Sequence, residues 1–400
     1  MAIDSPFFLT KVECPICKTV NEYETVRLGA YVENGRDTDF CPRDITWRFP
    51  RYQTYHPLVF FIATCSNCFY SREITSNFKD WKNDHNFRTY RLRNIKEKHL
   101  DQLATADSFV KKLGEAIDIA RFPNESGILK LHLAIFDELL CEHHSQLDVA
   151  RFYLRIAWIF RNLEQSENPR GAFLRGLLQE IDTKYHLTED TQQALQNRID
   201  EFAQSINMSF DTEDIAAELK SQVYPYRDKF AAILSVLNDS LLQVKQKLDD
   251  LGQLVGEYKS VNFSTDGSGT GAGFEGHRSF EEFLLDVKKS WRAVVTNEHE
   301  AMKKAADFYK RAFTEGRDIA PGNQQIQAAY LIAELSRRVG RYEEARQYFN
   351  ATIRHGQEFI HKNRHDPTQT ALARKILELA IEQGKTNMEA MKSLEKTGAM

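Results

Sequence analysis

The stretch "GRYEEARQYFNATI" at residues 340–353 indicates how most of this chain folds. Ala345, Phe349 and Thr352 stand at offsets of 0, 4 and 7, which places them on one face of a helix. Small residues at two of these positions allow a second helix to approach closely, and the aromatic ring between them fills the gap. The stretch therefore predicts a pair of closely packed antiparallel helices.

The same offsets occur at two other places, namely Ala305, Tyr309 and Ala312, and Ala150, Leu154 and Ala157. The core Gly-x-Tyr-x-x-Ala-x-x-x-Phe at 340–349 resembles the tetratricopeptide repeat, in which helix pairs stack into a solenoid. We expect a mainly α fold with a tetratricopeptide-like helical-repeat body over residues 78–187 and 280–400. A plain helix bundle explains the two outer sites nearly as well.

The first part of the chain, residues 1–77, has a different texture. "YETVRLGAYVE" and "PLVFFIATC" are rich in β-branched and aromatic residues, and Asn34-Gly35 is a turn signal. Two Cys-x-x-Cys pairs, at 14–17 and 65–68, each lie beside a predicted strand. We therefore predict a small N-terminal β zinc ribbon over residues 1–77.

The four cysteines of these pairs are the candidate metal ligands: Cys14, Cys17, Cys65 and Cys68. A two-residue gap lets both sulfurs of a knuckle point at one ion, and two knuckles supply the four thiolates of a closed tetrahedral zinc site. Redox-active pairs instead occupy a strand-to-helix turn of a βαβ unit, which is not predicted here. We expect structural zinc, and four thiolates leave no open position for catalysis.

Other cysteine and histidine residues are weaker candidates. Cys41 and His56 lie in the same segment, and either could replace a ligand or stand beside the site. We interpret them as a buried thiol and a surface imidazole, because four cysteines already complete the site. The clusters "CEHH" at 141–144 and "HKNRH" at 361–365 have no third ligand in evidence, so we interpret both as solvated helix ends.

A strict heptad pattern runs through the middle of the chain, at Phe230, Leu234, Leu237, Leu241, Val244, Leu248, Leu251, Val255 and Tyr258. Such a helix needs a partner. One candidate is the preceding segment "EDTQQALQNRIDEFAQSI", folding back as a hairpin, and the other is the same helix in a homodimer. We predict a coiled-coil or helical-hairpin insertion at 188–261, followed by a Gly/Ser-rich linker at 262–279.

The composition is that of a soluble globular protein, with 42% hydrophobic and 28% charged residues and a formal net charge of −4. This balance gives no general attraction to nucleic acid or to an anionic membrane. No apolar stretch reaches the roughly eighteen residues of a membrane-spanning helix, and the N-terminus lacks the basic and apolar regions of a signal peptide. We expect no membrane partner and a cytoplasmic location, where thiols stay reduced.

The segment "FKDWKNDHNFRTYRLRNIKEKHL" at 78–100 is basic and interleaved with Trp81, Phe87 and Tyr90. Basic residues among aromatic rings can meet phosphates and stack on bases, so a nucleic-acid interface is one interpretation. The other is a connecting segment whose aromatic side chains pack on the ribbon. We favour the second, because the chain as a whole carries no positive charge.

Five stretches taken in order resemble one known family: "CPIC", "DTDF", "ATCSNCFY", "ARFYLRIAWIFR" and "AAYLIAELSRRVGRYEEARQYFNATI". They look like the uncharacterised bacterial family called domain of unknown function 2225. The resemblance implies a zinc-binding head at the four cysteines and a tetratricopeptide-like body, and it supplies no activity. We do not expect it to extend to the heptad segment and the linker, which we interpret as an insertion.

Lys18 and Phe69 stand where a glycine often follows such knuckles, which leaves the tightness of the two turns open. No nucleophile motif, phosphate-binding loop or zinc-protease motif is present in the sequence. We therefore expect a non-enzymatic, zinc-containing interaction scaffold that binds a protein or peptide partner through its helical-repeat surface. The alternative is a nucleic-acid-binding regulator that uses the ribbon and the basic 79–98 segment.

Overall fold

The computed structural model describes residues 5–165, 169–209, 215–260, 274 and 276–397. Contacts divide the chain into two compact units. We call the first the main unit, which comprises Met1–Arg48, Tyr55–Ser166 and Thr265–Met400. We call the second the hairpin unit, which comprises Phe49–Thr54 and Glu167–Ser264. Each unit is described separately below.

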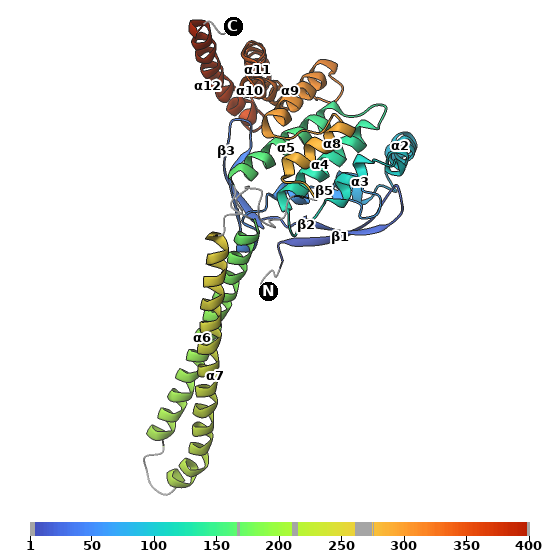
Figure 1. Ribbon diagram of the computed structural model, residues 1–400. Helices are drawn as coiled ribbons and strands as arrows, with labels where there is room; N and C mark the ends of the chain where they lie inside the picture. The colour runs from blue at the N-terminus through green and yellow to red at the C-terminus, as the bar shows by residue number, and fades with distance from the viewer. Residues whose placement is uncertain (1–4, 166–168, 210–214, 261–273, 275, 398–400) are drawn as a thin grey trace. The chain divides into compact units, whose positions relative to one another are not determined.

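The main unit begins with three successive two-stranded antiparallel hairpins (Figure 1). They pair β1 (Phe7–Glu13) with β2 (Val20–Val26), β3 (Tyr31–Arg36) with β4 (Pro42–Trp47), and β5 (Ile62–Thr64) with β6 (Ser71–Glu73). The predicted strand-and-turn character of the N-terminal region is confirmed. The stretch "PLVFFIATC" differs in detail, since it opens as the short helix η2 (Pro57–Phe60), with Pro57 at its first position, before β5 begins.

The turn of the second hairpin is not at the Asn-Gly pair that the sequence suggested. Asn34 and Gly35 lie inside β3, where Gly35 adopts a φ of 72°. The chain reverses after β3 instead, where Asp37 N donates to Cys41 O at 2.7 Å and Phe40 takes a φ of 67°. The prediction of a turn at Asn34-Gly35 was therefore wrong.

Buried charges explain why the reversal occurs at this point. Arg161 contacts Asp37 at 3.1 Å and Asp39 at 2.7 Å, and Asp39 is fully buried. Arg338 contacts Asp37 at 3.1 Å and Glu334 at 2.8 Å. The hairpin tip is thus fixed by tertiary ion pairs rather than by the local preference of an Asn-Gly pair.

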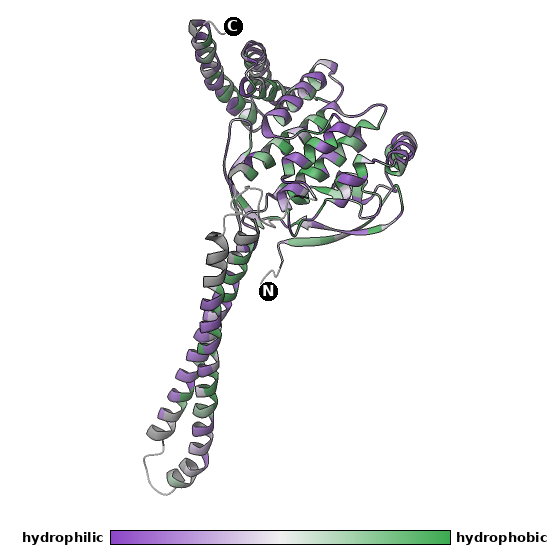
Figure 2. Cartoon of the chain, in the orientation of Figure 1, coloured by the Kyte–Doolittle hydropathy of each residue, from purple (hydrophilic) through white to green (hydrophobic). Residues whose placement is uncertain are grey.

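The rest of the main unit is helical, as predicted. Its elements are α1 (Ser76–Lys79), η3 (Phe87–Arg91), α2 (Leu92–Ala104), α3 (Phe109–Glu115), α4 (Pro123–Leu139), α5 (Gln146–Gln165), α8 (Phe280–Ser290), α9 (Glu298–Glu315), α10 (Asn323–Arg338), α11 (Tyr342–Lys362) and α12 (Pro367–Thr397). Hydrophobic residues are concentrated in α4 and α5 (Figure 2). None of the described helices combines the length and apolarity needed to cross a lipid bilayer.

The large helices pack as a chain of neighbours, α4 on α5, α5 on α9, α9 on α10, α10 on α11 and α11 on α12. Helices α5 and α9 are distant in sequence, yet the rings of Tyr153 and Phe308 stack with centroids 5.6 Å apart. The nine residues at the repeated offsets are all buried: Ala150, Leu154, Ala157, Ala305, Tyr309, Ala312, Ala345, Phe349 and Thr352. Close helix packing at these places is confirmed, and the tetratricopeptide assignment stays a prediction.

The hairpin unit consists of α6 (Pro169–Ser209) and α7 (Ile215–Ser260), with η1 (Pro50–Tyr52) against α6. The two long helices are antiparallel, because Lys245 Nζ lies 2.8 Å from Asp182 and Gln192 donates to Leu234 O at 3.4 Å. Of the two partners predicted for the heptad helix, the preceding segment is the one that α7 contacts.

Pairing with α6 covers only part of the heptad seam. Leu234 is 5% exposed, whereas Leu237, Val244 and Leu251 are 40%, 47% and 46% exposed. The side chains of Val255 and Tyr258 and most of the predicted linker at 262–279 lie outside the described residues. The predicted start of an insertion at 188 stays a prediction, and α6 continues through that residue.

Candidate metal centre

The first Cys-x-x-Cys pair forms the turn between β1 and β2. Cys14 N donates to Thr19 O at 2.8 Å, and Lys18 N donates to Cys14 O at 3.0 Å. These two bonds fold the chain back tightly, with Lys18 in the left-handed region at a φ of 67°. The resulting turn places Cys14 and Cys17 on the same side.

The second pair repeats this geometry between β5 and β6. Cys65 N donates to Tyr70 O at 2.9 Å, and Phe69 N donates to Cys65 O at 2.9 Å. Phe69 is also left-handed, with a φ of 63°. Both turns are therefore as tight as a glycine would make them, and the strain of a side chain in this region, about 1–2 kcal/mol each, is carried by the surrounding structure.

The two turns bring four sulfur atoms together. Cys14 Sγ lies 3.6 Å from Cys68 Sγ, Cys17 Sγ lies 3.5 Å from Cys65 Sγ, and all four lie within 4.8 Å of one another. A tetrahedron with metal–sulfur distances of about 2.3 Å has edges of about 3.8 Å. The separations are far longer than the roughly 2.05 Å of a disulfide, so the four free thiols fit one metal ion.

The surroundings favour ionised sulfur at the centre of the cluster. Hydrogen bonds from Cys14 and Cys68 lower the pKa of the Cys65 thiol, while the bond to Cys65 raises the pKa of Cys14 to about 12. Asn21 Nδ2 lies 3.5 Å from Cys65 Sγ, and Ser66 N donates to Asn21 Oδ1 at 2.9 Å. One thiolate stabilised by neighbouring donors is a natural starting point for metal uptake.

The cluster is enclosed by the ribbon and by the segment that follows it. Cys14, Cys65 and Cys68 are each 1% exposed. Trp81 and Phe87 pack into the same hydrophobic cluster as these three cysteines. Three of the four cysteines are therefore shielded from solvent, while Cys17 is partly exposed.

The basic 79–98 segment contributes its aromatic residues to the ribbon. Trp81 Nε1 donates to Glu13 O at 2.7 Å, and Phe87 is fully buried. Tyr90 is the exception, at 71% exposure. Two of the three rings expected to stack on bases are thus not available to a nucleic acid, which agrees with the connecting-segment interpretation.

A buried pair that the sequence did not indicate supports the second turn. His99 Nε2 lies 2.7 Å from Cys68 O, and His99 Nδ1 lies 2.6 Å from Asp137 Oδ1. Ser71 N donates to the other oxygen of Asp137 at 2.7 Å. Burial opposes the charged form of His99, but the Asp137 carboxylate outweighs it and raises the pKa of His99 to about 9. No spacing rule connects these residues, because they come from α2, α4 and the turn.

The remaining sequence candidates lie elsewhere. Cys41 packs beside Asp39 and Arg161, and burial raises the pKa of its thiol to about 12. His56 is buried rather than on the surface, and its Nδ1 accepts from Leu58 N at 3.2 Å. Among the residues that the structure describes, the cysteine cluster contains neither of them. His361 and His365 are exposed near the end of α11, as expected for a solvated helix end.

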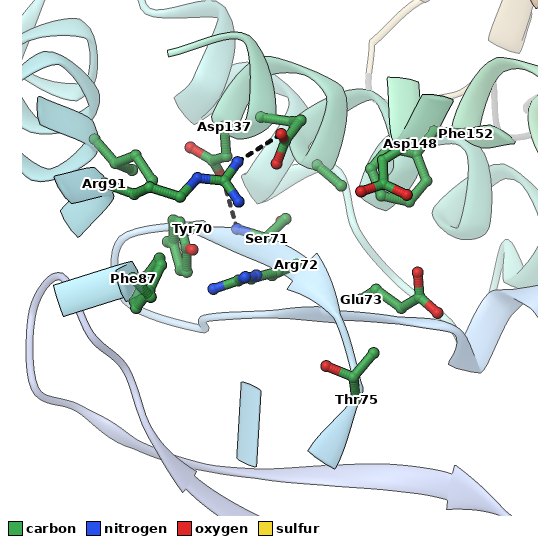
Figure 3. A pocket seen from close by; sticks show the side chains of 13 residues that line it. Tyr70, Ser71, Arg72, Glu73, Thr75, Phe87, Arg91, Asp137, Asp148 and Phe152 are labelled. Carbon is green, nitrogen blue, oxygen red and sulfur yellow. Dashed lines mark hydrogen bonds and ion pairs between the residues drawn. The ribbon is translucent and has the colours of Figure 1, made fainter. Parts of the chain in front are cut away.

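A small pocket lies between β6, η3 and the end of α4, close to this support (Figure 3). Its volume is about 110 Å³, well below that of most ligand sites. Arg91, on one wall, contacts Glu138 at 2.5 Å and Cys141 Sγ at 3.1 Å. These three side chains contact one another, whereas Arg72, on the same lining, lies over the Phe87 ring at 4.4 Å and its buried Nη1 has no hydrogen-bond partner among the described residues.

Comparison with known proteins places the chain in a family. The family model described as "Uncharacterized protein conserved in bacteria", DUF2225, matches residues 7–250 and 284–392. The match includes the heptad segment as far as residue 250, so the expectation that this segment lies outside the family was wrong. No curated protein and no solved structure matches the chain. The chain belongs to the bacterial family called domain of unknown function 2225.

Proposed function

We propose that this protein is a non-enzymatic interaction scaffold of the reducing cytoplasm. Its head holds a structural zinc ion through Cys14, Cys17, Cys65 and Cys68, and its helical body binds a protein or peptide partner. The observation that carries the proposal is the set of four sulfurs at the start of a long chain of packed helices.

Zinc is the metal that this donor set suits best. Soft thiolates in tetrahedral geometry select zinc or iron, and a zinc ion with four cysteines serves folding rather than catalysis. The three hairpins of the head are only two-stranded, and hairpins of this size are marginally stable alone. A metal that joins the first and third hairpins would therefore contribute directly to the folding of the head.

The helical body supplies a broad polar surface. Helix α10 is largely buried between its neighbours, while α11 turns Gln347, Asn350, Arg354 and Glu358 outward along one face. Extended surfaces of stacked helices are the common binding sites of solenoid proteins. This supports a protein or peptide partner more than a small substrate.

The nucleic-acid alternative has less support. The basic side chains of 79–98 are mostly exposed, but Trp81 and Phe87 are buried in the ribbon. Without those rings, binding would rest mainly on charge, with Tyr90 as the one exposed ring of the three, and it would weaken as salt rises. The scaffold proposal needs no such charge.

Metal content of the purified full-length chain tests the head. We expect one zinc per chain by elemental mass spectrometry, with loss of that zinc in Cys14→Ser and in Cys65→Ser. Cys41→Ser is the matched control, since Cys41 is a buried cysteine outside the cluster, and it should keep the metal. A wild-type protein without stoichiometric zinc would overturn the zinc assignment.

The scaffold role is tested by cross-linking in the native bacterium followed by affinity purification. We expect a protein partner that co-purifies in a fixed ratio and rebinds the purified chain in calorimetry. Turnover of a small molecule by the metal-loaded chain, or retention of RNA or DNA at 0.15 M salt instead of a protein, would contradict it.

A further inference from the structure

A second pocket shares no lining residue with the pocket of Figure 3. A half-open cavity of about 760 Å³ lies between β1 and β2, β5 and the second knuckle, and the segment after α3, and Leu9 and Val20 on its rim are 66% and 63% exposed. Its volume falls within the roughly 300–1,000 Å³ of typical small-molecule sites. Much of the wall is apolar and includes Leu9, Phe60, Ile62, Phe69, Ile117 and Ile119.

One cationic group belongs to this apolar wall. Lys130 of α4 lines the cavity and is 7% exposed. Its Nζ donates to Val59 O at 2.7 Å, and among the described residues no carboxylate forms an ion pair with it. An ammonium group has three donors, so two remain for another acceptor. Glu24 acts on this ammonium only from beyond ion-pair distance. A buried ammonium without a directly bonded carboxylate is costly, which is a reason to look for a ligand.

The carboxylates in the wall restrict the charge of such a ligand. Glu22 and Glu24 line the same cavity from β2. Burial raises the pKa of Glu24, although Lys130 opposes this effect. Glu22 is paired with Lys11 at 3.0 Å, which leaves Glu24 as the carboxylate without an ion pair among the described residues. A single negative charge can pair with Lys130, whereas a second one would face Glu24. The cavity therefore discriminates against a phosphate dianion.

We propose that this cavity binds an apolar monocarboxylate, with its carboxylate on Lys130 Nζ and its hydrocarbon against Leu9, Phe69 and Ile117. The ligand class follows from one buried ammonium, an apolar wall and the opposing carboxylate of Glu24. The site is independent of the scaffold function, since it needs neither the protein partner nor the outer faces of the helices.

The state of the amine in the empty cavity agrees with this arrangement. Burial lowers the pKa of Lys130 to about 8, and Glu24 only partly offsets the effect. The amine is therefore still mostly protonated near neutral pH and becomes better stabilised when an anion arrives. Ligand binding and protonation of Lys130 support each other.

Calorimetric titration of the metal-loaded, full-length chain with three probes of equal chain length tests the proposal at pH 7. Octanoate should bind saturably. The affinity for 1-octanol should be at least tenfold lower than that for octanoate, and the affinity for octyl phosphate should also be lower. Lys130→Met should lower the affinity for octanoate at least tenfold and leave the affinity for 1-octanol unchanged. Lys111→Met, a change of an exposed lysine on α3, is the matched control and should behave as wild type.

A second pair of variants leaves Lys130 in place. Leu9→Ser removes part of the apolar wall and should weaken octanoate severalfold. Phe8→Ser changes the neighbouring exposed residue, which does not line the cavity, and should have no effect. The proposal is overturned if octanoate does not bind at millimolar concentration, if it binds no better than 1-octanol, or if Lys130→Met binds it as wild type does.

Discussion

Two residues in the left-handed region, Lys18 and Phe69, set the geometry of the four-cysteine cluster. Each one closes a knuckle where a glycine would be unstrained. They differ in what their side chains do. Lys18 is half exposed, with Nζ 4.3 Å from the centre of the Trp81 ring, whereas Phe69 lies against Gly114 of α3.

This difference gives the first prediction. Lys18→Gly should raise the free energy of unfolding by about 0.5–1 kcal/mol, because relief of strain exceeds the added entropy of the unfolded chain. Phe69→Gly should lower it, because the packing of the ring is lost. Urea denaturation of the metal-loaded chain measures both. A destabilised Lys18→Gly protein would show that the exposed lysine contributes more than its strain costs.

A second prediction about a single residue concerns Lys130 and the pH dependence of the free energy of unfolding. Its pKa is about 8 when folded and about 10.4 when unfolded, so between these values the unfolded state binds more protons. The free energy of unfolding of the wild type should therefore rise, relative to Lys130→Met, as pH increases from 8 to 10.5. The full change is about 3 kcal/mol at most. Parallel curves for the two proteins across this range would contradict the burial of a charged amine.

At the scale of elements, the contact of the second knuckle with α3 depends on the missing side chain of Gly114. A Cβ there would lie 2.1 Å from Phe69 Cγ. Gly114→Ala should destabilise the main unit by about 1–3 kcal/mol despite the higher helix propensity of alanine. Gly252→Ala in α7 is the control, since a Cβ there meets nothing within 4 Å. This control substitution should raise the free energy of unfolding of the hairpin unit by about 0.5–1 kcal/mol, as measured by thermal denaturation.

The hairpin of α6 and α7 leaves apolar residues uncovered, and this leads to a prediction about assembly. Two helices cover one side of a heptad seam, whereas four helices would also cover Leu237 and Val244. We expect the full-length chain to form a homodimer through this hairpin, with a light-scattering mass about twice 46.3 kDa. Leu237→Lys with Val244→Lys should give the monomer mass, and Gln246→Lys, an exposed polar control, should not. A wild-type monomer at all concentrations would rule out this dimer.

At the scale of the whole main unit, Arg161 joins segments that are far apart in sequence. It binds Asp37 and Asp39 of the second hairpin and Glu298 at the start of α9. Arg161→Met should lower the free energy of unfolding by about 3–5 kcal/mol, because it leaves the fully buried Asp39 with only the longer contacts to Arg338 at 3.9 Å and Cys41 N at 3.3 Å. Adding Asp39→Asn should recover part of the loss. Additive losses in this double-mutant cycle would show that the two side chains act independently.

Much of the candidate site was predictable from local pattern. The Cys-x-x-Cys spacing determined the four sulfurs, because a two-residue gap geometrically directs both side chains of a knuckle to one point. The offsets at Ala345, Phe349 and Thr352 predicted a closely packed helix face, because an α-helix has 3.6 residues per turn and residues at offsets of 0, 4 and 7 therefore share one face. The heptad pattern likewise predicted a long helix and a partner for it.

The tertiary structure decided what local pattern could not. It moved the second turn from Asn34-Gly35 to 37–41, because ion pairs with Arg161 and Arg338 outweigh a local turn preference. It brought His99 and Asp137 to the second knuckle from separate helices. It also placed Lys130 under an apolar cavity built from three distant segments. The sequence alone determined the knuckles and the helices, since these follow from spacing, whereas buried charges depend on which segments meet and were therefore decided only by the folded chain.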